Sequence, residues 1–172
     1  MYTSAGFFME IGEAKLSAEL LEFVDKGDKP IVVSFSSMPL RKPESFKQKL
    51  MAALTATGNR AVILTGTIFK KAKGLIHHGG VGTMAEALLS GAPQLIIPFS
   101  VDQPFWAHRL YAKGYALRPL REKSLETAEL IEAFRNMESQ HYLNKAKETK
   151  GIIQSENGLR KAVCYVEKVY AG

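Results

Sequence analysis

The sequence predicts an α/β fold, a Rossmann-like parallel sheet with helices on both faces, followed by a helical C-terminal segment. Two observations lead to this fold class. Short aliphatic runs alternate with stretches that carry apolar residues at helical spacing. After the last such run, the chain keeps helical spacing to its end. Strands separated by helices form βαβ units, which build a parallel sheet covered on both faces.

Four strands are expected, each from a short, mainly apolar run typical of a buried parallel strand: Ile31–Phe35, Ala61–Leu64, Gly74–His77 and Gln94–Ile97. The apolar spacing and the stop signals predict seven helices. They are Glu13–Val24, Glu44 to the Gly58-Asn59 stop, Thr83–Ser90, Pro104–Lys113, Leu125–Asn136, His141–Ile153 and Asn157–Val169.

Composition predicts one domain over residues 1–172, because no linker, repeat or low-complexity stretch divides the chain. With 46% hydrophobic and 23% charged residues, usage is that of a globular protein. The only cysteine, Cys164, excludes an internal disulfide and favours a cytoplasmic location. The apolar runs are too short to span a bilayer, and the N-terminus lacks the pattern of a secretory signal.

The net charge of +6 is compatible with an anionic partner or simply with solubility. Lysines and arginines occur in small groups, such as Arg41-Lys42 and Lys70-Lys71-Lys73, without a long basic tract. No aromatic residues are interleaved with them as in nucleic-acid surfaces. We therefore expect no nucleic-acid partner.

The most informative stretch is a strand that runs into glycines and at once into a helix, His77-His78-Gly79-Gly80-Val81-Gly82-Thr83. Glycines let the backbone approach a ligand, and the N–H groups at a helix start point toward an anion. His78 is placed to donate to a phosphate oxygen, and His77 is expected on the opposite face. The alternative is a generic strand-to-helix turn in which Thr83 caps the helix. P-loop and dinucleotide-binding spacings are absent.

A second polar cluster, Asp102-Gln103, follows the last strand. The carboxyl ends of parallel strands meet at one edge, so this pair is expected beside His78 and Thr83. A carboxylate next to an amide suits neutral hydroxyl groups. The alternative is that Asp102 only caps the helix that starts near Pro104. Trp106 is expected to pack on that helix.

Taken together, these motifs resemble the nucleotide-sugar-binding half of GT-B glycosyltransferases, and in particular the UDP-glucosyl/glucuronosyltransferase family. The residues that carry the likeness are His78-Gly79-Gly80-Val81-Gly82-Thr83, Glu86, Ser90-Gly91-Ala92-Pro93 and Pro98…Asp102-Gln103-Pro104-Phe105-Trp106-Ala107. The spacing from His78 to Glu86 and on to Asp102 matches the family signature.

The resemblance implies a role for each matching residue. His78 would contact the donor diphosphate, with Gly80, Gly82 and Thr83 supplying the donors around it. Glu86 would bind ribose hydroxyls. Asp102 and Gln103 would hold the transferred sugar, and Ser37 would lie near the phosphates. No metal or other cofactor is implied, because helix dipole and donors supply the positive charge.

Three departures from the family pattern stand out. Ser36 replaces the glycine that usually precedes the serine at position 37. Only Thr65–Lys73 lies where the family has a further strand, a helix and a base-stacking motif. The acceptor-binding half, with its catalytic base, is missing, so no catalytic residue is expected in this chain; His108 and His141 are expected to be surface or packing residues.

The sequence therefore predicts a donor-binding domain of an enzyme that transfers a hexose from a UDP-sugar to an acceptor hydroxyl. Its partner would be an N-terminal acceptor-binding domain in the same or a separate chain, and a lipid-like acceptor would bring the enzyme to a membrane surface. The alternatives are a donor-binding subunit of a two-chain transferase and a degenerate interaction module of the same fold.

Overall fold

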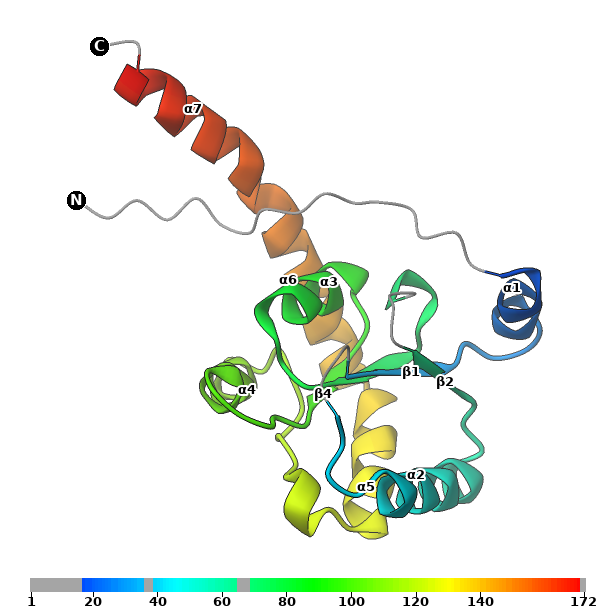
Figure 1. Cartoon of the computed structure of the whole chain (residues 1–172). Coiled ribbons are helices and arrows are strands. Elements are labelled where there is room, and N and C mark those ends of the chain that lie inside the picture. Colours follow the sequence, from blue (N-terminus) through cyan, green and yellow to red (C-terminus); the bar gives the residue numbers. More distant parts are fainter. Residues whose placement is uncertain (1–16, 36–38, 65–68, 171–172) are drawn as a thin grey trace.

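The computed structural model describes residues 17–35, 39–64 and 69–170. In chain order the elements are α1 (Ala18–Asp25), β1 (Ile31–Ser34), α2 (Pro43–Thr57), β2 (Ala61–Leu64), the short helix η1 (Phe69–Lys71), β3 (Gly74–His77), α3 (Val81–Ser90), β4 (Gln94–Ile96), α4 (Gln103–Ala112), η2 (Glu122–Ser124), α5 (Thr127–Met137), α6 (Gln140–Glu156) and α7 (Gly158–Tyr170). The predicted α/β fold with a helical C-terminal segment is confirmed (Figure 1). The first residues of the helix predicted at 13–24 lie outside the described residues.

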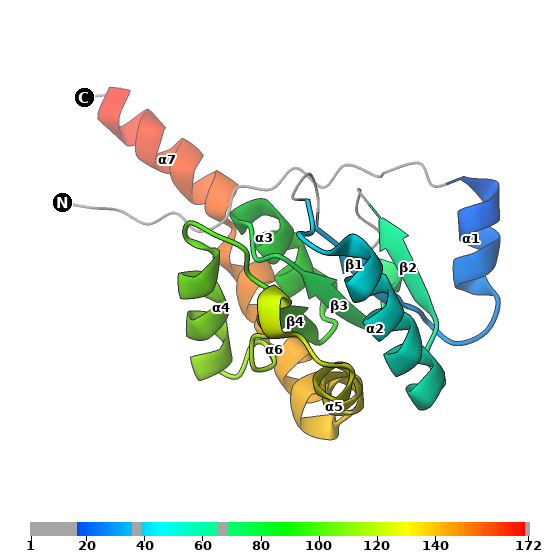
Figure 2. The ribbon, with the colours of Figure 1, turned by 60° about the horizontal axis from the view of Figure 1, so that its bottom comes forward.

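The four strands form one parallel sheet in the order β2-β1-β3-β4, seen side by side in Figure 2. The register pairs Ser34 with His77 and His77 with Ile96, so the last residues of three strands lie in one row. From β1 the chain passes to β2 on one side of β1, and from β2 it passes to β3 on the other side. The boundary between β1 and β3 is therefore the switch point of the sheet. Ligands of open α/β sheets bind outside the strand ends at such a point.

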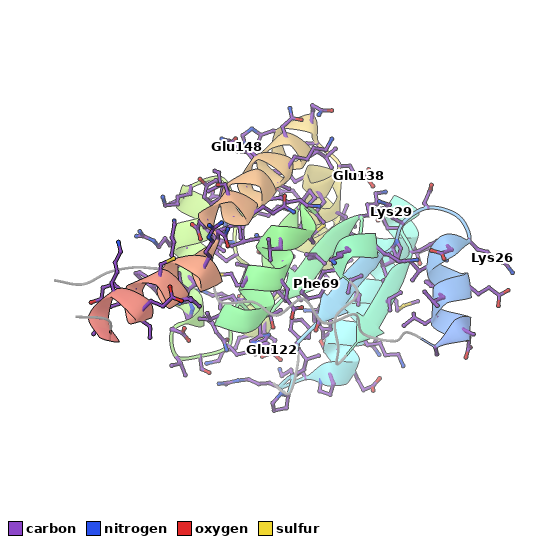
Figure 3. All side chains as sticks on the ribbon, turned by 90° about the horizontal axis from the view of Figure 1, so that it is seen from above. Lys26, Lys29, Phe69, Glu122, Glu138 and Glu148 are labelled. Carbon is purple, nitrogen blue, oxygen red and sulfur yellow. The ribbon has the colours of Figure 1, made fainter. Side chains whose placement is uncertain are left out.

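Helices cover both faces of the sheet. Successive residues of each strand point to opposite faces and therefore belong to two separate core layers. On one face Val33 and Ile76 pack with α2 and α5, which are drawn below the sheet in Figure 1. On the other face Val32 and Leu75 pack with α1, η1 and α3. Phe69 of η1, labelled in Figure 3, is buried in that second layer. The continuous aliphatic runs of the strands are therefore filled from both sides, as a parallel sheet requires.

The strand β2 departs from the prediction of a fully buried strand. It lies at the edge of the sheet and pairs only with β1. Val62 is buried against the second layer, but Ile63 is 61% exposed. Its side chain points to the face covered by α2 and α5, and those helices do not cover it at the sheet edge. The prediction was wrong for Ile63, because the alternation of a strand shows which face a residue takes and not which strand lies at an edge.

The C-terminal helices α6 and α7 are separated at Asn157, whose φ of 49° is left-handed, a conformation that asparagine tolerates. The predicted break between two helices is therefore confirmed. Beyond it, α7 extends away from the sheet and the other helices in both Figure 1 and Figure 2. Its apolar residues Val163, Val166 and Val169, spaced three residues apart, are about half exposed. They form one stripe on a helix face, which we call the α7 stripe.

Replacing Phe134 with alanine tests the core between the sheet and the two helices below it. Phe134 of α5 is completely buried among β-strand and α2 side chains. We expect Phe134→Ala to lower the free energy of unfolding by about 3–5 kcal/mol, because the cavity that it leaves cannot collapse fully. Urea denaturation measures this change. Met51→Ala on the exposed side of α2 is the control, and a similar loss in both variants would contradict the assignment.

Candidate functional site

The turn between β3 and α3 is built from two glycines that have no room for a side chain. Gly79 adopts a φ of 88°, and a Cβ there would lie 2.8 Å from Cγ2 of Ile96. A Cβ on Gly80 would collide with the ring of His78. Both positions therefore require glycine, one for its backbone conformation and one for its close contact with the histidine.

The start of α3 leaves backbone donors without a partner in the helix. The first intrahelical bond runs from the N–H of Met84 to the carbonyl of Gly80, at 2.8 Å. The N-cap residue is Gly80, and no side chain caps this end. A Cβ on Gly82 would meet nothing within 4 Å among the described residues, so the backbone here faces open space. An uncapped helix start of this kind attracts anions.

Thr83 does not cap α3. It is the third residue of the helix, which begins at Val81, two residues before the predicted start at Thr83. The alternative in which Thr83 is the N-cap is therefore wrong. Its half-buried side chain lies in the first turn of the helix. Glu86, in the next turn of the same helix, is also half buried.

His78 is buried at the edge where β1 and β3 end. Its ring is only 6% exposed, and Nδ1 is buried without a hydrogen-bond partner among the described residues. Burial lowers the pKa of His78, and a hydrogen bond with the backbone carbonyl of Ser34 opposes this only in part. A buried polar atom without a partner is costly and needs an explanation, such as a bound group that completes its hydrogen bonding.

His77 takes a different direction, as the alternation of a strand predicts. Its ring is fully buried, with Nε2 2.8 Å from Oε1 of Gln94 on the neighbouring strand. Nδ1 accepts the backbone N–H of Gly79 at 3.1 Å. Burial, more than the opposing bond to Gln94, lowers the pKa of His77 to about 4, and nearby His78 lowers it further. His77 is therefore neutral at physiological pH.

The loop between β4 and α4 is held by Gln103. Its Oε1 accepts the backbone N–H groups of Phe99 and Ser100, at 2.8 and 3.2 Å, and its side chain is only 7% exposed. The sequence predicted that this amide would both accept from and donate to a ligand. In the folded chain its oxygen is already bonded twice, so the amide NH₂ group is what it can offer.

Asp102 stands beside it, exposed at the first position before α4. Asp102 is the N-cap residue of α4, as the alternative predicted, but its side chain makes no capping hydrogen bond. Instead Oδ2 accepts the indole N–H of Trp106 at 3.0 Å. Trp106 also packs against the core layer below α4, as expected. The bond orients the carboxylate, which can still accept further hydrogen bonds.

The residue before Asp102 is strained. Val101 has a φ of 58°, a left-handed conformation that is unfavourable for a β-branched side chain, and it is 92% exposed. Strained residues of this kind are concentrated at functional sites. Gly79 and Gln103 are in contact, since a Cβ on Gly79 would lie 3.7 Å from Cβ of Gln103. The glycine turn and the Asp102 loop thus adjoin, as the shared strand edge predicted.

The sequence also singled out Ser37, His108 and His141. Ser37 lies outside the described residues. His108 and His141 are exposed, as expected for surface residues. Among residues 17–35, 39–64 and 69–170, no three His, Cys, Asp or Glu side chains are grouped to hold a metal ion. No helix within these ranges is long and apolar enough to cross a membrane.

The sequence predicted only which face of the sheet His77 takes. It did not identify Gln94 or Val101 as part of the site. Gln94 carried a usable signal, because a polar side chain inside an apolar strand needs a buried partner. The left-handed backbone of Val101 has no signature in a single sequence.

The fold is that of one class of protein. The family model of the erythromycin biosynthesis protein CIII-like C-terminal domain matches residues 20–156, and the chain belongs to this family of C-terminal domains of GT-B glycosyltransferases. Among its relatives is a sterol 3-beta-glucosyltransferase of Arabidopsis thaliana, 30% identical over 169 residues that cover 85% of this chain and 26% of the relative. The solved structure of the spinosyn forosaminyltransferase SpnP superposes with a TM-score of 0.72 at 20% identity, covering 96% of this chain and 49% of that one.

The chain spans only a part of these relatives. A sterol 3-beta-glucosyltransferase of Komagataella phaffii, 30% identical, aligns with 96% of this chain but only 16% of its own length. That alignment extends over 204 positions, more than the 172 residues of this chain. The relative therefore has residues inside the matched region that have no counterpart here.

The burial of His77 predicts a specific dependence of stability on pH. The unfolded chain takes up a proton near pH 6.5, whereas folded His77 does so near pH 4. The contribution of neutral His77 is thus fully present above pH 6.5 and is lost as the pH falls toward 4. Between pH 7 and pH 5 we expect the wild type to lose about 2 kcal/mol more unfolding free energy than His77→Gln. Urea denaturation at both pH values measures the difference, and equal losses would contradict it.

Proposed function

We propose that this chain is the donor-binding domain of an enzyme that transfers a hexose from a UDP-sugar to an acceptor hydroxyl. The single observation that carries the proposal is the pairing of buried Nδ1 of His78 with the start of α3, both without a side-chain partner among the described residues. Both lie at the switch point of the sheet, where the helix start offers backbone N–H donors to an anionic group. The His78 ring already donates to the Ser34 carbonyl through its other nitrogen, so Nδ1 donates when the ring is protonated, a form that a bound diphosphate would favour.

The diphosphate would lie over the helix start. The N–H groups near Gly80, Gly82 and Thr83, together with the His78 ring, would offset the charge that builds on the leaving diphosphate. These donors and the helix dipole support binding without a metal ion. Glu86, one turn further along α3, would accept hydrogen bonds from ribose hydroxyls. Ser37, which comes three residues after the end of β1 in the sequence, would approach the phosphates.

Asp102 and Gln103 would orient the transferred sugar. Because Oε1 of Gln103 is bonded to Phe99 and Ser100, we infer that Gln103 donates through its NH₂ group and that Asp102 accepts. The bond between Trp106 and Asp102 holds the carboxylate in place for this task. A sugar held by one donor and one acceptor is fixed in orientation, which is what a transfer reaction needs.

In the reaction, the acceptor oxygen would bond to the anomeric carbon while the bond from that carbon to the diphosphate oxygen breaks. The acceptor proton would pass to a base in the acceptor-binding half, in the same or a separate chain. The isolated domain should therefore bind UDP weakly without turnover. The lone Cys164 supports a cytoplasmic location, and the sterol-acting relatives support a lipid-like acceptor at a membrane surface.

We infer that the α7 stripe contacts this missing half. The chain spans 26% of the Arabidopsis thaliana relative and about half of the spinosyn transferase chain, so a large part of the complete enzyme lies elsewhere. Val163, Val166 and Val169 expose apolar surface on a helix that extends from the fold. Apolar stripes of this kind usually mark an interface.

A non-catalytic interaction module of the same fold is the second candidate. The observation that favours it is that β2 pairs only with β1 among the described residues and that its Ile63 is exposed, since an edge strand is a template for pairing with another chain. A folded domain whose melting temperature does not rise with millimolar UDP or UDP-glucose would favour this alternative.

Calorimetry with UDP tests the donor site. We expect His78→Ala to weaken binding about tenfold or more, because one hydrogen bond to a charged group is lost from the diphosphate. Asp102→Ala should leave UDP binding unchanged and weaken UDP-glucose, because it removes only the sugar contact.

Two variants sharpen the assignment. His108→Ala, exposed on α4, should bind as the wild type does. Gly82→Ala should fold normally, since its Cβ meets no described residue within 4 Å, yet weaken UDP binding by crowding the space over the helix start. The donor-site proposal fails if the folded wild-type domain shows no heat with millimolar UDP, or if Gly82→Ala binds UDP normally.

The interface of α7 is tested by co-purification of this domain with an acceptor-binding half, supplied in the same or a separate chain. We expect Val166→Asp to abolish co-purification of the two halves, because it puts a charge into the α7 stripe. Lys168→Asp is the matched control, since it puts the same charge on the opposite side of the helix and should leave the complex intact. Equal retention of both variants would refute an interface on the stripe.

A further inference from the structure

We propose that His77 is a positioning residue of the donor site: its ring links the Gly79 backbone to β4 and thereby fixes the turn that presents His78 and the start of α3. This inference deepens the proposed function and rests on it for its effect on binding. His77 itself is completely buried and has no path to a ligand. It would act only through the backbone that it holds.

The hydrogen bonds around His77 form a chain with a forced direction. The Tyr115 carbonyl can only accept, so Nε2 of Gln94, at 3.1 Å, must donate to it. This turns Oε1 of Gln94 toward Nε2 of His77, at 2.8 Å, and an amide oxygen can only accept. The imidazole must therefore carry its proton on Nε2.

The Gly79 end of this series of hydrogen bonds independently requires the same tautomer of His77. The backbone N–H of Gly79 can only donate, and it points at Nδ1 of His77 from 3.1 Å. Nδ1 must therefore carry a lone pair. One neutral tautomer, with the proton on Nε2, satisfies every bond from Tyr115 to Gly79. Burial, which lowers the pKa of His77 to about 4, keeps the ring in this neutral form at physiological pH.

Gly79 is the residue of the turn where such a restraint matters most. It has a left-handed φ of 88° and lies against Ile96 and Gln103, between the two halves of the site. It is also flanked by His78, whose Nδ1 has no partner among the described residues, and by Gly80, the N-cap of α3. Hydrogen bonds weaken steeply with misalignment, so a small shift of the Gly79 peptide would misdirect these donors.

Two substitutions separate the two ends of the ring. In His77→Asn, the side-chain amide can place an acceptor near the position of Nδ1, but it does not reach Gln94. In His77→Gln, the longer amide can reach Gln94 near the position of Nε2, but the acceptor for Gly79 is lost. Both variants remove the ring and leave a buried amide, so each serves as the matched control of the other.

We expect Gly79 amide exchange, measured by NMR, to be at least about tenfold faster in His77→Gln than in His77→Asn. UDP should bind about tenfold more weakly to His77→Gln, whereas His77→Asn should restore affinity to within about threefold of the wild type. A merely structural role would affect both variants alike. Equal exchange rates and equal affinities in the two folded variants would overturn the proposal.

A measurement on the unaltered chain covers the case in which either variant does not fold. The ¹⁵N shifts of the His77 ring at pH 7 should show a protonated Nε2 and an unprotonated Nδ1. An Nδ1-protonated ring or an imidazolium would overturn the proposal. If the wild type binds no UDP, the donor-site proposal fails, while ring shifts and Gly79 exchange still decide whether His77 holds the turn.

Discussion

The parallel pairing of β3 with β1 and β4 is the constraint on which the rest of the structure depends. Its register brings Ser34, His77 and Ile96 into one row, so the three segments that follow leave the sheet at the same edge. The glycine turn and the Asp102 loop come from different βα units, yet they touch at Gly79 and Gln103. A shift of one residue in this register would turn His77 and Ile96 to the opposite face and separate the two halves of the site.

The features that are unfavourable for stability gather at this edge. Among the residues that the structure describes, Nδ1 of His78 is buried without a partner and the start of α3 has no side-chain cap. Val101 has a strained backbone. Each costs stability that a different residue would have avoided. Buried, well-bonded groups surround them, in particular His77 with Gln94 and Gln103 with the Phe99 and Ser100 amides. The buried groups beneath the site are held by hydrogen bonds, whereas the groups that line it have unused hydrogen-bonding capacity. Such a site is suited to a ligand that completes these hydrogen bonds.

Strand positions and most helices were predictable, because an aliphatic run or a helical apolar stripe is a property of neighbouring residues. The start of α3 was placed two residues late, since Val81 and Gly82 lack helical signals and only the geometry of the turn brings them into the helix. The burial of Ile63 was predicted wrongly, because sheet order depends on residues distant in the chain. The bond of Asp102 with Trp106, four residues away, was not foreseen either, because the sequence does not show which local partner the carboxylate takes.

By itself, the sequence determined the α/β class, the chain's likeness to donor-binding domains and the residue types at the anion site, because glycines, a histidine and a helix start keep their chemistry in any arrangement. Only the tertiary structure decided which atoms of those groups remain available for hydrogen bonds to a ligand. Gln103 has its oxygen already bonded by the loop, His77 is committed to Gln94 and Gly79, and His78 keeps a buried nitrogen without a partner. The physical reason is that hydrogen-bonding capacity depends on burial and on partners, and both are set by contacts between distant parts of the chain.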